Sequence, residues 1–271
     1  MKLLDLSADQ KAIVGMIHVG ALPGTPRYAR PLADVVTQAA REAELYTCAG
    51  LDGLLIENMH DVPYLCGQVG PEIVAGMTAA GVAVRQASAL PLGVQILAAA
   101  NCAALAVAQA CGAAFVRVEN FAYAHVADEG LMPTAEAGPL LRYRRQMGAE
   151  QVAIIADVKK KHSSHALTAD VSLAEAARTT EFFGADGIVV TGVATAQPAA
   201  VADVRAVRQA VRVPVCIGSG LTPENLAEYW ADTDVFIVGS YFKVDGLWSN
   251  ALDPARVRRF MDVVRALRAG R

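Results

Sequence analysis

A glycine-rich segment near the C-terminus has the composition of a phosphate-binding loop. Residues 217–225 read Ile-Gly-Ser-Gly-Leu-Thr-Pro-Glu-Asn, and a second Gly-Ser pair follows the next apolar run. Glycines let backbone N–H groups approach an anion. We also expect Thr222 to be the N-cap and Pro223 the first residue of a helix, and the N-terminus of a helix favours negative charge. Tight turns that only cap helices are the alternative. We interpret the segments as a phosphate site made by Gly218, Ser219, Gly220, Gly239 and Ser240.

Other apolar runs end in acidic, basic or imidazole side chains, which are groups that transfer protons. Asp157 and Lys159 close one run and share a face because side chains alternate along a strand. Arg117 and Glu119 share a face of another run. If these faces point inward, acidic and basic groups converge, although an inward arginine can also simply bridge carboxylates. The candidates for catalysis are His18, Glu57, Glu119, Asp157 and Lys159.

Lys159 begins a run of three lysines that is otherwise typical of a solvated loop. Among the three we select Lys159, which has the parity to enter a barrel beside Asp157. There it could neutralise a substrate phosphate, act as a base with a lowered pKa, or form a Schiff base. We favour the first two roles.

The five histidines all fall at or after the ends of apolar runs, and none lies in an expected helix: His18, His60, His125, His162 and His165. A single loop histidine is commonly a structural hydrogen-bonding group, but this grouping favours an acid/base or metal site. We expect further polar residues after these runs to line the substrate loops: Asn58, His60, Asp61, His125, Asp128, His162 and Thr191.

A divalent metal ion is an open possibility as a cofactor. It would need carboxylate ligands such as Glu57, Glu119 and Asp157, with His18 as a further candidate. No fixed ligand spacing identifies such a site, so the cofactor stays unknown at this point.

The elements that must position these groups alternate regularly between strand and helix. Eight short aliphatic runs predict strands at residues 12–18, 53–57, 92–97, 114–119, 152–158, 187–191, 213–218 and 234–239. Helical periodicity occupies residues 33–49, 71–86, 101–111, 173–183, 199–211, 223–230 and 254–268. This order predicts an α/β fold, a single (β/α)8 TIM barrel over residues 1–271, with an active site at the C-terminal ends of its strands. An open doubly wound sheet is the alternative, and the lack of a Gly-x-Gly-x-x-Gly opening disfavours it.

The longest connection outside a helix runs from Asn120 to about Ala135, and its length suits a lid or site loop. The apolar region 90–118 is interrupted by Gln95, Asn101 and Gln109, so it reads as strand, helix and strand and not as a membrane span. The alanine-rich stretch 101–111 could pack against another subunit, so we expect a homo-oligomer.

Composition narrows the classes of partner. A net charge of −3 provides no field for nucleic acid, so we expect no nucleic-acid partner and favour a small phosphorylated molecule. Five scattered cysteines argue against a disulfide framework, and the residues after Met1 lack the apolar stretch of a signal peptide. We therefore expect a cytoplasmic protein.

Four ordered segments resemble the motifs of the BtpA/SgcQ family: residues 15–28 (Gly-Met-Ile-His-Val-Gly-Ala-Leu-Pro-Gly-Thr-Pro-Arg-Tyr), 57–64 (Glu-Asn-Met-His-Asp-Val-Pro-Tyr), 125–130 (His-Val-Ala-Asp-Glu-Gly) and 157–162 (Asp-Val-Lys-Lys-Lys-His). The resemblance implies a ribulose-phosphate-binding type of barrel. Residues 219–225 are also similar to the phosphate loop of phosphoribosylanthranilate isomerase. The chain departs from the family at residues 95–99, where Gln-Ile-Leu-Ala-Ala replaces Asn-x-Leu-Arg-Asn, which puts a polar contribution from that strand in doubt.

Two functions follow from these observations. The first is an enzyme that acts on a phosphosugar or nucleotide-like phosphate by acid/base isomerase, lyase or hydrolase chemistry. The second, implied only by the family name, is a non-catalytic factor in the biogenesis of a photosystem membrane complex. That factor would use the barrel as a binding scaffold and associate with membranes peripherally, without a transmembrane segment.

Overall fold

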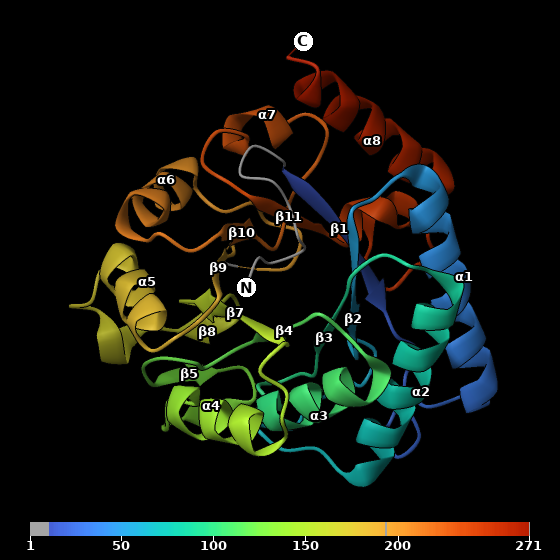
Figure 1. Cartoon of the computed structure of the whole chain (residues 1–271), viewed down its shortest axis with the longest axis horizontal. Coiled ribbons are helices and arrows are strands. Elements are labelled where there is room, and N and C mark those ends of the chain that lie inside the picture. Colours follow the sequence, from blue (N-terminus) through green and yellow to red (C-terminus); the bar gives the residue numbers. More distant parts are fainter. Residues whose placement is uncertain (1–10, 193, 271) are drawn as a thin grey trace.

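Eight parallel strands close into a barrel in the computed structural model, which describes residues 11–192 and 194–270. The strands follow the order β1-β2-β3-β4-β7-β9-β10-β11, and β11 pairs with β1 to complete the ring (Figure 1). The bounds are β1 (Ala12–His18), β2 (Gly53–Glu57), β3 (Leu92–Gln95), β4 (Phe115–Val118), β7 (Ala153–Val158), β9 (Gly187–Val190), β10 (Val215–Ile217) and β11 (Val235–Val238). The expected (β/α)8 fold is confirmed, and every predicted strand end lies within two residues of the observed one.

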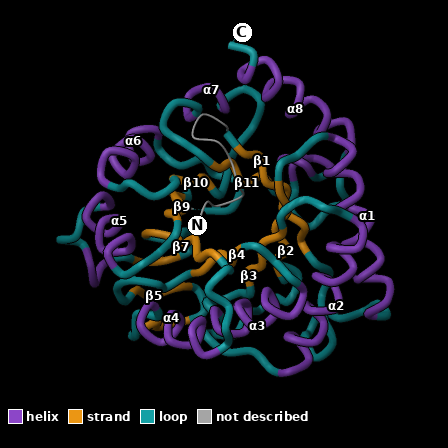
Figure 2. The backbone as a smooth tube through the Cα atoms, viewed as in Figure 1, coloured by secondary structure: helices purple, strands orange, loops and turns teal. Residues whose placement is uncertain are grey.

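Helices cover the outside of this barrel (Figure 2). Their bounds are α1 (Leu32–Ala49), α2 (Pro71–Ala87), α3 (Asn101–Cys111), α4 (Ala137–Gln146), α5 (Leu173–Phe182), α6 (Val201–Ala210), α7 (Leu226–Tyr229) and α8 (Pro254–Arg268). The sequence analysis missed α4. Within that helix only Ala137 and Leu140 are buried, so its apolar periodicity is too weak to stand out.

The expected helix start at Pro223 is wrong. The helix α7 begins at Leu226 and has four residues, so Thr222 is not its N-cap. Asn225 explains the delay: its Oδ1 accepts a hydrogen bond from the Thr222 N–H at 2.9 Å, and its Nδ2 donates to the Gly220 carbonyl at 2.9 Å. These side-chain bonds to the backbone hold residues 220–225 as a loop instead of a first helical turn.

The barrel interior is packed with side chains. Alternate residues point inward and form one apolar cluster that includes Met16, Leu55 and Ile155. Phe115 fills the space beside Gly93, where a Cβ atom would lie 2.2 Å from the Phe115 ring. The barrel therefore has a solid floor, and its hollow lies at the C-terminal ends of the strands.

The long connection after β4 forms part of a small second sheet. The strands β5 (His125–Ala127) and β6 (Gly130–Met132) make a hairpin, and β5 also pairs with β8 (Ser163–Ser164), which follows β7. We call β5, β6 and β8 the cap sheet. Lys160 ties this sheet to the barrel, because its Nζ lies 3.3 Å from Glu119 Oε1 after β4 and 3.7 Å from Glu129 Oε2 in the hairpin turn.

The alanine-rich helix α3 is part of the ring of helices. It packs against α2 and α4, and its buried residues include Ala104, Leu105 and Ala108. Across residues 11–192 and 194–270, no helix combines the length and the apolar character that crossing a bilayer requires.

Candidate active site

The C-terminal ends of the strands bring the predicted polar residues to one opening. His18 pairs with Glu57 across β1 and β2, and Glu57 pairs with Gln95 across β2 and β3. The buried core residues Met16 and Leu55 lie two positions before His18 and Glu57, so these polar side chains continue the inward-facing rows.

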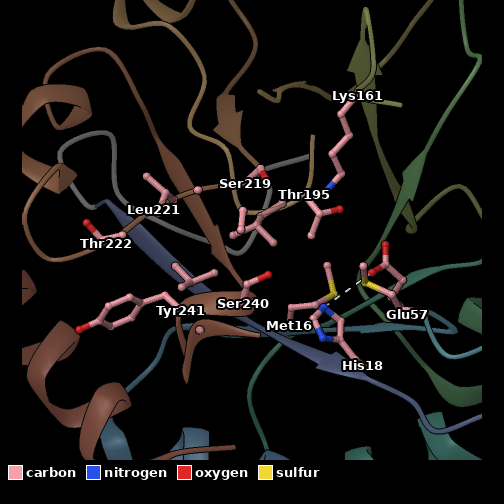
Figure 3. Close-up of a pocket in the computed structure, with 18 of the residues that line it drawn as sticks. Met16, His18, Glu57, Lys161, Thr195, Ser219, Leu221, Thr222, Ser240 and Tyr241 are labelled. Carbon is pink, nitrogen blue, oxygen red and sulfur yellow. Dashed lines mark ion pairs between the residues drawn. The ribbon is translucent and has the colours of Figure 1, made fainter. Parts of the chain in front are cut away.

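We call the hollow at this opening the main cavity. Its volume is about 150 Å³. The glycine-rich segments after β10 and β11 form one wall, and Glu57, His18 and Lys161 belong to the other (Figure 3). The predicted phosphate residues and two of the predicted catalytic residues therefore line a shared space.

Backbone donors remain available on the glycine-rich wall. The Gly218 N–H donates to the Val190 carbonyl at 3.0 Å, so this residue provides space and not a donor. The N–H groups of Ser219, Gly220 and Ser240 meet no acceptor within residues 11–192 and 194–270. Arg256, which the sequence analysis did not single out, also lines this cavity and adds a positive charge.

His18 is held in one tautomer. Its Nδ1 lies 3.0 Å from the Trp248 carbonyl, which can only accept, so Nδ1 carries the proton and Nε2 presents a lone pair. Burial, and then the charge of Lys243, lower the pKa of His18 to about 3. The imidazole is therefore neutral at pH 7.

Glu57 faces this imidazole across 3.9 Å, measured from its Oε2 to His18 Nε2 (dashed line in Figure 3). Burial raises the pKa of Glu57, while the charges of Arg117 and Lys161 oppose that shift. A carboxyl group with a raised pKa can donate and accept a proton closer to neutral pH than an ordinary glutamate. Because His18 is neutral, the two groups do not form an ion pair.

Arg117 and Asp157 form a buried bidentate pair. Arg117 donates from Nε and Nη2 to the two carboxylate oxygens of Asp157 at 2.8 and 2.9 Å. Arg117 thus binds a carboxylate across neighbouring strands, as the alternative interpretation of this residue stated. Both oxygens of Asp157 are occupied, which leaves Asp157 as a structural partner rather than a free base.

The lysine expected beside Asp157 lies elsewhere. Lys159 has a φ of 43°, which interrupts the alternation of β7, and its Nζ donates to the Thr168 carbonyl at 3.1 Å. Lys161 instead lines the main cavity (Figure 3). Burial, and then the charge of Arg117, lower the pKa of Lys161, while Glu57 opposes that shift.

A second hollow of about 210 Å³, which we call the side hollow, opens beside the main cavity and shares Glu57, Arg117 and Lys161 with it. Its other polar lining comes from β3, from the segment after β4, and from the cap sheet with its flanking residues: Gln95, Glu119, Asp128, Glu129, Lys160 and His162. Gln95 is 2 % exposed, so β3 does place a polar side chain at the opening despite its departure from the family pattern.

Some predicted loop residues serve the scaffold. Asp61 accepts hydrogen bonds from the Leu22 N–H and from Asn58 Nδ2, and Asn58 Oδ1 accepts from the Leu97 N–H. Thr191 Oγ1 accepts from the Lys161 N–H at 3.1 Å and so positions the lysine of the main cavity.

The remaining predicted histidines lie in separate surroundings. His125 packs against His165 with the rings tilted by 43° and 5.6 Å between ring centroids, and neither residue lines the main cavity. His60 packs on Trp248 and lines a third hollow behind His18. His162 contacts Asp128 through Nδ1 at 3.4 Å and lines the side hollow.

The carboxylates considered as metal ligands do not fit a divalent ion as they stand. Asp157 is bound by Arg117, and Glu119 accepts from the Ala99 N–H at 3.0 Å and from Lys160. Throughout the described part of the chain, no three His, Cys, Asp or Glu side chains gather around a common point. We therefore derive no step that uses a metal.

Sequence reasoning missed four groups at this opening: Lys161, Thr195, Trp248 and Arg256. Lys161 was set aside in favour of Lys159, although both have the parity of Asp157, and Arg256 was read only as part of a helix. A signal was available for Trp248, since it is one of two tryptophans and lies in the segment between the last strand and the last helix.

Comparisons with known proteins agree with this architecture. Among solved structures, (S)-3-O-geranylgeranylglyceryl phosphate synthase from Thermoplasma acidophilum, in complex with sn-glycerol-1-phosphate, aligns with a TM-score of 0.62 at 15 % identity, covering 98 % of this chain and 99 % of that one. Phosphoribosyl anthranilate isomerase from Thermus thermophilus aligns with a TM-score of 0.57 at 13 % identity, covering 94 % and 98 %. At these identities the likeness shows the fold alone.

Relatives by sequence span almost the whole chain. An uncharacterized mitochondrial protein of Caenorhabditis elegans is 46 % identical, covering 97 % of this chain and 96 % of its own. The photosystem I biogenesis protein BtpA of Synechocystis is 32 % identical, covering 97 % and 91 %. The model of the BtpA family matches residues 9–266, and the chain therefore belongs to the BtpA family.

Proposed function

We propose that this protein is an enzyme that binds a small phosphorylated molecule, of the phosphosugar type, and transfers protons on it. One observation carries the proposal: Ser219, Gly220 and Ser240, whose N–H groups meet no acceptor among the described residues, line the same cavity as Glu57 and Lys161. Free amides suit a phosphate, and a carboxyl group with a raised pKa suits acid/base work. The structural neighbours whose names include a phosphorylated compound agree with this ligand class.

We propose different roles for the three titratable side chains. Glu57 takes a proton from the substrate or returns it. Lys161 stabilises negative charge that develops on a substrate oxygen, since its side chain lines the cavity together with Glu57. His18 does not stabilise negative charge, because its Nε2 has no proton to donate; it accepts a hydrogen bond from a substrate hydroxyl or from protonated Glu57.

Binding can be tested by isothermal titration of the full-length chain against a panel of phosphosugars, with the unphosphorylated sugars as references. Ser219→Phe with Ser240→Phe should abolish binding by filling the phosphate wall. Ser164→Phe is the matched control, because Ser164 is exposed on the cap sheet. If no phosphosugar binds, or if the double variant binds as well as the wild type, the proposal is wrong.

Proton transfer can be tested without knowledge of the product. A phosphosugar that binds is incubated in D2O, and NMR follows deuterium exchange at carbons next to its carbonyl. Glu57→Gln should slow the exchange by about 10²–10⁴-fold while binding persists. Glu44→Gln, at an exposed position of α1, should leave the rate unchanged.

The name of the Synechocystis relative supports a second candidate function, that of a non-catalytic factor for a membrane complex. This function requires peripheral association with membranes. Flotation with lipid vesicles separates the two candidates: the enzyme remains in the soluble fraction, whereas the factor floats with the vesicles and shows no exchange activity.

A further inference from the structure

A third hollow lies behind His18, on the side away from the glycine-rich wall. Its volume is about 430 Å³, and we call it the cationic cavity. It is bounded by the loop between β1 and α1 and by the segment between β11 and α8; α1 and α8 lie on the right of Figure 1. His18 lines both this cavity and the main cavity.

The lining of this cavity has one sign of charge. Arg27, Arg30 and Lys243 contribute three cationic groups, and among the described residues that line the cavity none is acidic. The nearby carboxylate of Glu42 binds Lys243 Nζ at 2.7 Å and so compensates one of the three charges. Within residues 11–192 and 194–270, Arg27 and Arg30 have no acidic partner, and their two positive charges match the charge of a phosphate monoester.

Two of the three cations, Arg30 and Lys243, are joined by a chain of hydrogen bonds. Arg30 Nη2 donates to Gln38 Oε1 at 2.8 Å, and Gln38 Nε2 donates to Glu42 Oε1 at 3.3 Å. Glu42 in turn fixes Lys243, which is 1 % exposed. Gly20 leaves room for this arrangement, since a Cβ atom there would lie 2.8 Å from Arg30 Nη2. Side chains fixed in this way lose little freedom when an anion binds.

The pKa of His60, which also lines the cavity, responds to the same positive charges. Burial, and then the charges of Lys243, Arg30 and Arg27, lower the pKa of His60 to about 4. His60 is therefore neutral at pH 7 and can donate one hydrogen bond to an anion.

From the cavity, its three cations and the hydrogen bonds that join Arg30 to Lys243 through Gln38 and Glu42, we propose that the cationic cavity is a second anion-binding site that takes a phosphate-type group. This site is separate from the one in the main cavity. The group is either the second end of a bisphosphorylated substrate that spans both cavities around His18, or a separate phosphate-bearing molecule.

The test uses the full-length chain and inorganic phosphate at constant ionic strength. Calorimetry should show two phosphate ions bound per wild-type chain. Arg27→Gln with Arg30→Gln should remove one of them and leave the other, and both arginines are exposed, so the variant should keep its melting temperature. Arg41→Gln with Arg142→Gln removes two exposed arginines elsewhere and should still bind both ions.

A local readout assigns the lost ion to this cavity. Phosphate should shift the His60 imidazole resonances in the wild type and in Ser219→Phe with Ser240→Phe, but not in Arg27→Gln with Arg30→Gln. The proposal is overturned if His60 does not respond, or if the arginine variant binds phosphate as the wild type does. If only Ser219→Phe with Ser240→Phe loses bound phosphate, that loss belongs to the main cavity. Such a result bears on the proposed function and not on the cationic cavity.

A bisphosphorylated sugar then distinguishes the two sources of the phosphate group. A spanning substrate should bind at one molecule per chain, at least about tenfold more tightly than its monophosphate, and the Arg27→Gln with Arg30→Gln variant should lose this gain. If the cationic cavity takes a separate ligand, the bisphosphate should bind no more tightly than its monophosphate, while the second inorganic phosphate ion still binds.

Discussion

Two lysines that lie two residues apart have opposite surroundings. Lys159 bonds the Thr168 carbonyl, whereas Lys161 reaches the main cavity beside Glu57. We expect Lys161→Met to lower the rate of deuterium exchange by about 10²–10³-fold, as does the loss of one group that stabilises a developing oxyanion. Lys159→Met is the matched control and should keep the rate within about twofold of the wild type. Equal losses in the two variants would contradict this assignment.

Glu57 should also affect how the free energy of unfolding depends on pH, and the direction of this effect follows from its raised pKa. The folded protein holds the Glu57 proton more tightly than the unfolded chain does. As the pH rises above the ordinary value of 4.5, the unfolded chain releases this proton first, so the free energy of unfolding falls until the pKa of the folded state is passed.

The glutamine of the Glu57→Gln variant cannot ionise, so this fall in the free energy of unfolding with rising pH should be absent from the variant. Urea unfolding at about pH 4 and about pH 7 should therefore show the variant gaining stability relative to the wild type as the pH rises. Glu44→Gln, whose side chain is exposed, should follow the wild-type curve. Parallel curves for Glu57→Gln and the wild type would mean that Glu57 has the same pKa in the folded and unfolded states.

At the scale of elements, the Arg117–Asp157 pair joins β4 to β7 beneath the opening. Removing one partner leaves a buried charge unpaired, so Arg117→Met or Asp157→Leu alone should cost about 3–5 kcal/mol of unfolding free energy. The double variant should cost clearly less than the sum of the two, which denaturant unfolding measures. The exposed Arg259–Glu224 pair is the control, and its removal should cost about 1 kcal/mol or less.

The elements also show where sequence reasoning succeeds and where it stops. The barrel strands are buried on both faces and bounded by helices, so their apolar runs locate them within two residues. The cap sheet was missed because its short strands are held by pairing with each other, for example Val126 with Leu131 and with Ser164, and not by an apolar run. The start of α7 depends on two side-chain bonds from Asn225, which no periodicity reveals.

For the candidate site, the predicted strand ends locate His18 and Glu57, which line one cavity. Strand parity fails at Lys159, because this residue lies in the left-handed region and so interrupts the alternation of side chains. The alternation rule applies only within a strand, and β7 ends at Val158. Beyond a strand end, side-chain parity no longer indicates which residues face the site.

At the scale of the whole molecule, the main cavity is lined by residues from the first two strands of the barrel and by residues at the ends of the last two. His18 and Glu57 come from β1 and β2, whereas the glycine-rich wall follows β10 and β11, and the ring is closed by the pairing of β1 with β11. A ligand held by both walls therefore binds only the closed barrel. Binding must then stabilise the fold as a whole.

Inorganic phosphate at ten times its dissociation constant should add about 1.4 kcal/mol to the free energy of unfolding for each occupied site, measured by denaturant unfolding. Ser219→Phe with Ser240→Phe should lose the contribution of the main cavity, and Ser164→Phe should keep it. Sulfate at matched ionic strength controls for general salt effects, although it can occupy the same sites more weakly. Stabilisation that is equal in the wild type and the double serine variant would show that phosphate does not bind at the wall where β10 and β11 end, and the closed barrel would then have no ligand linking its first and last strands.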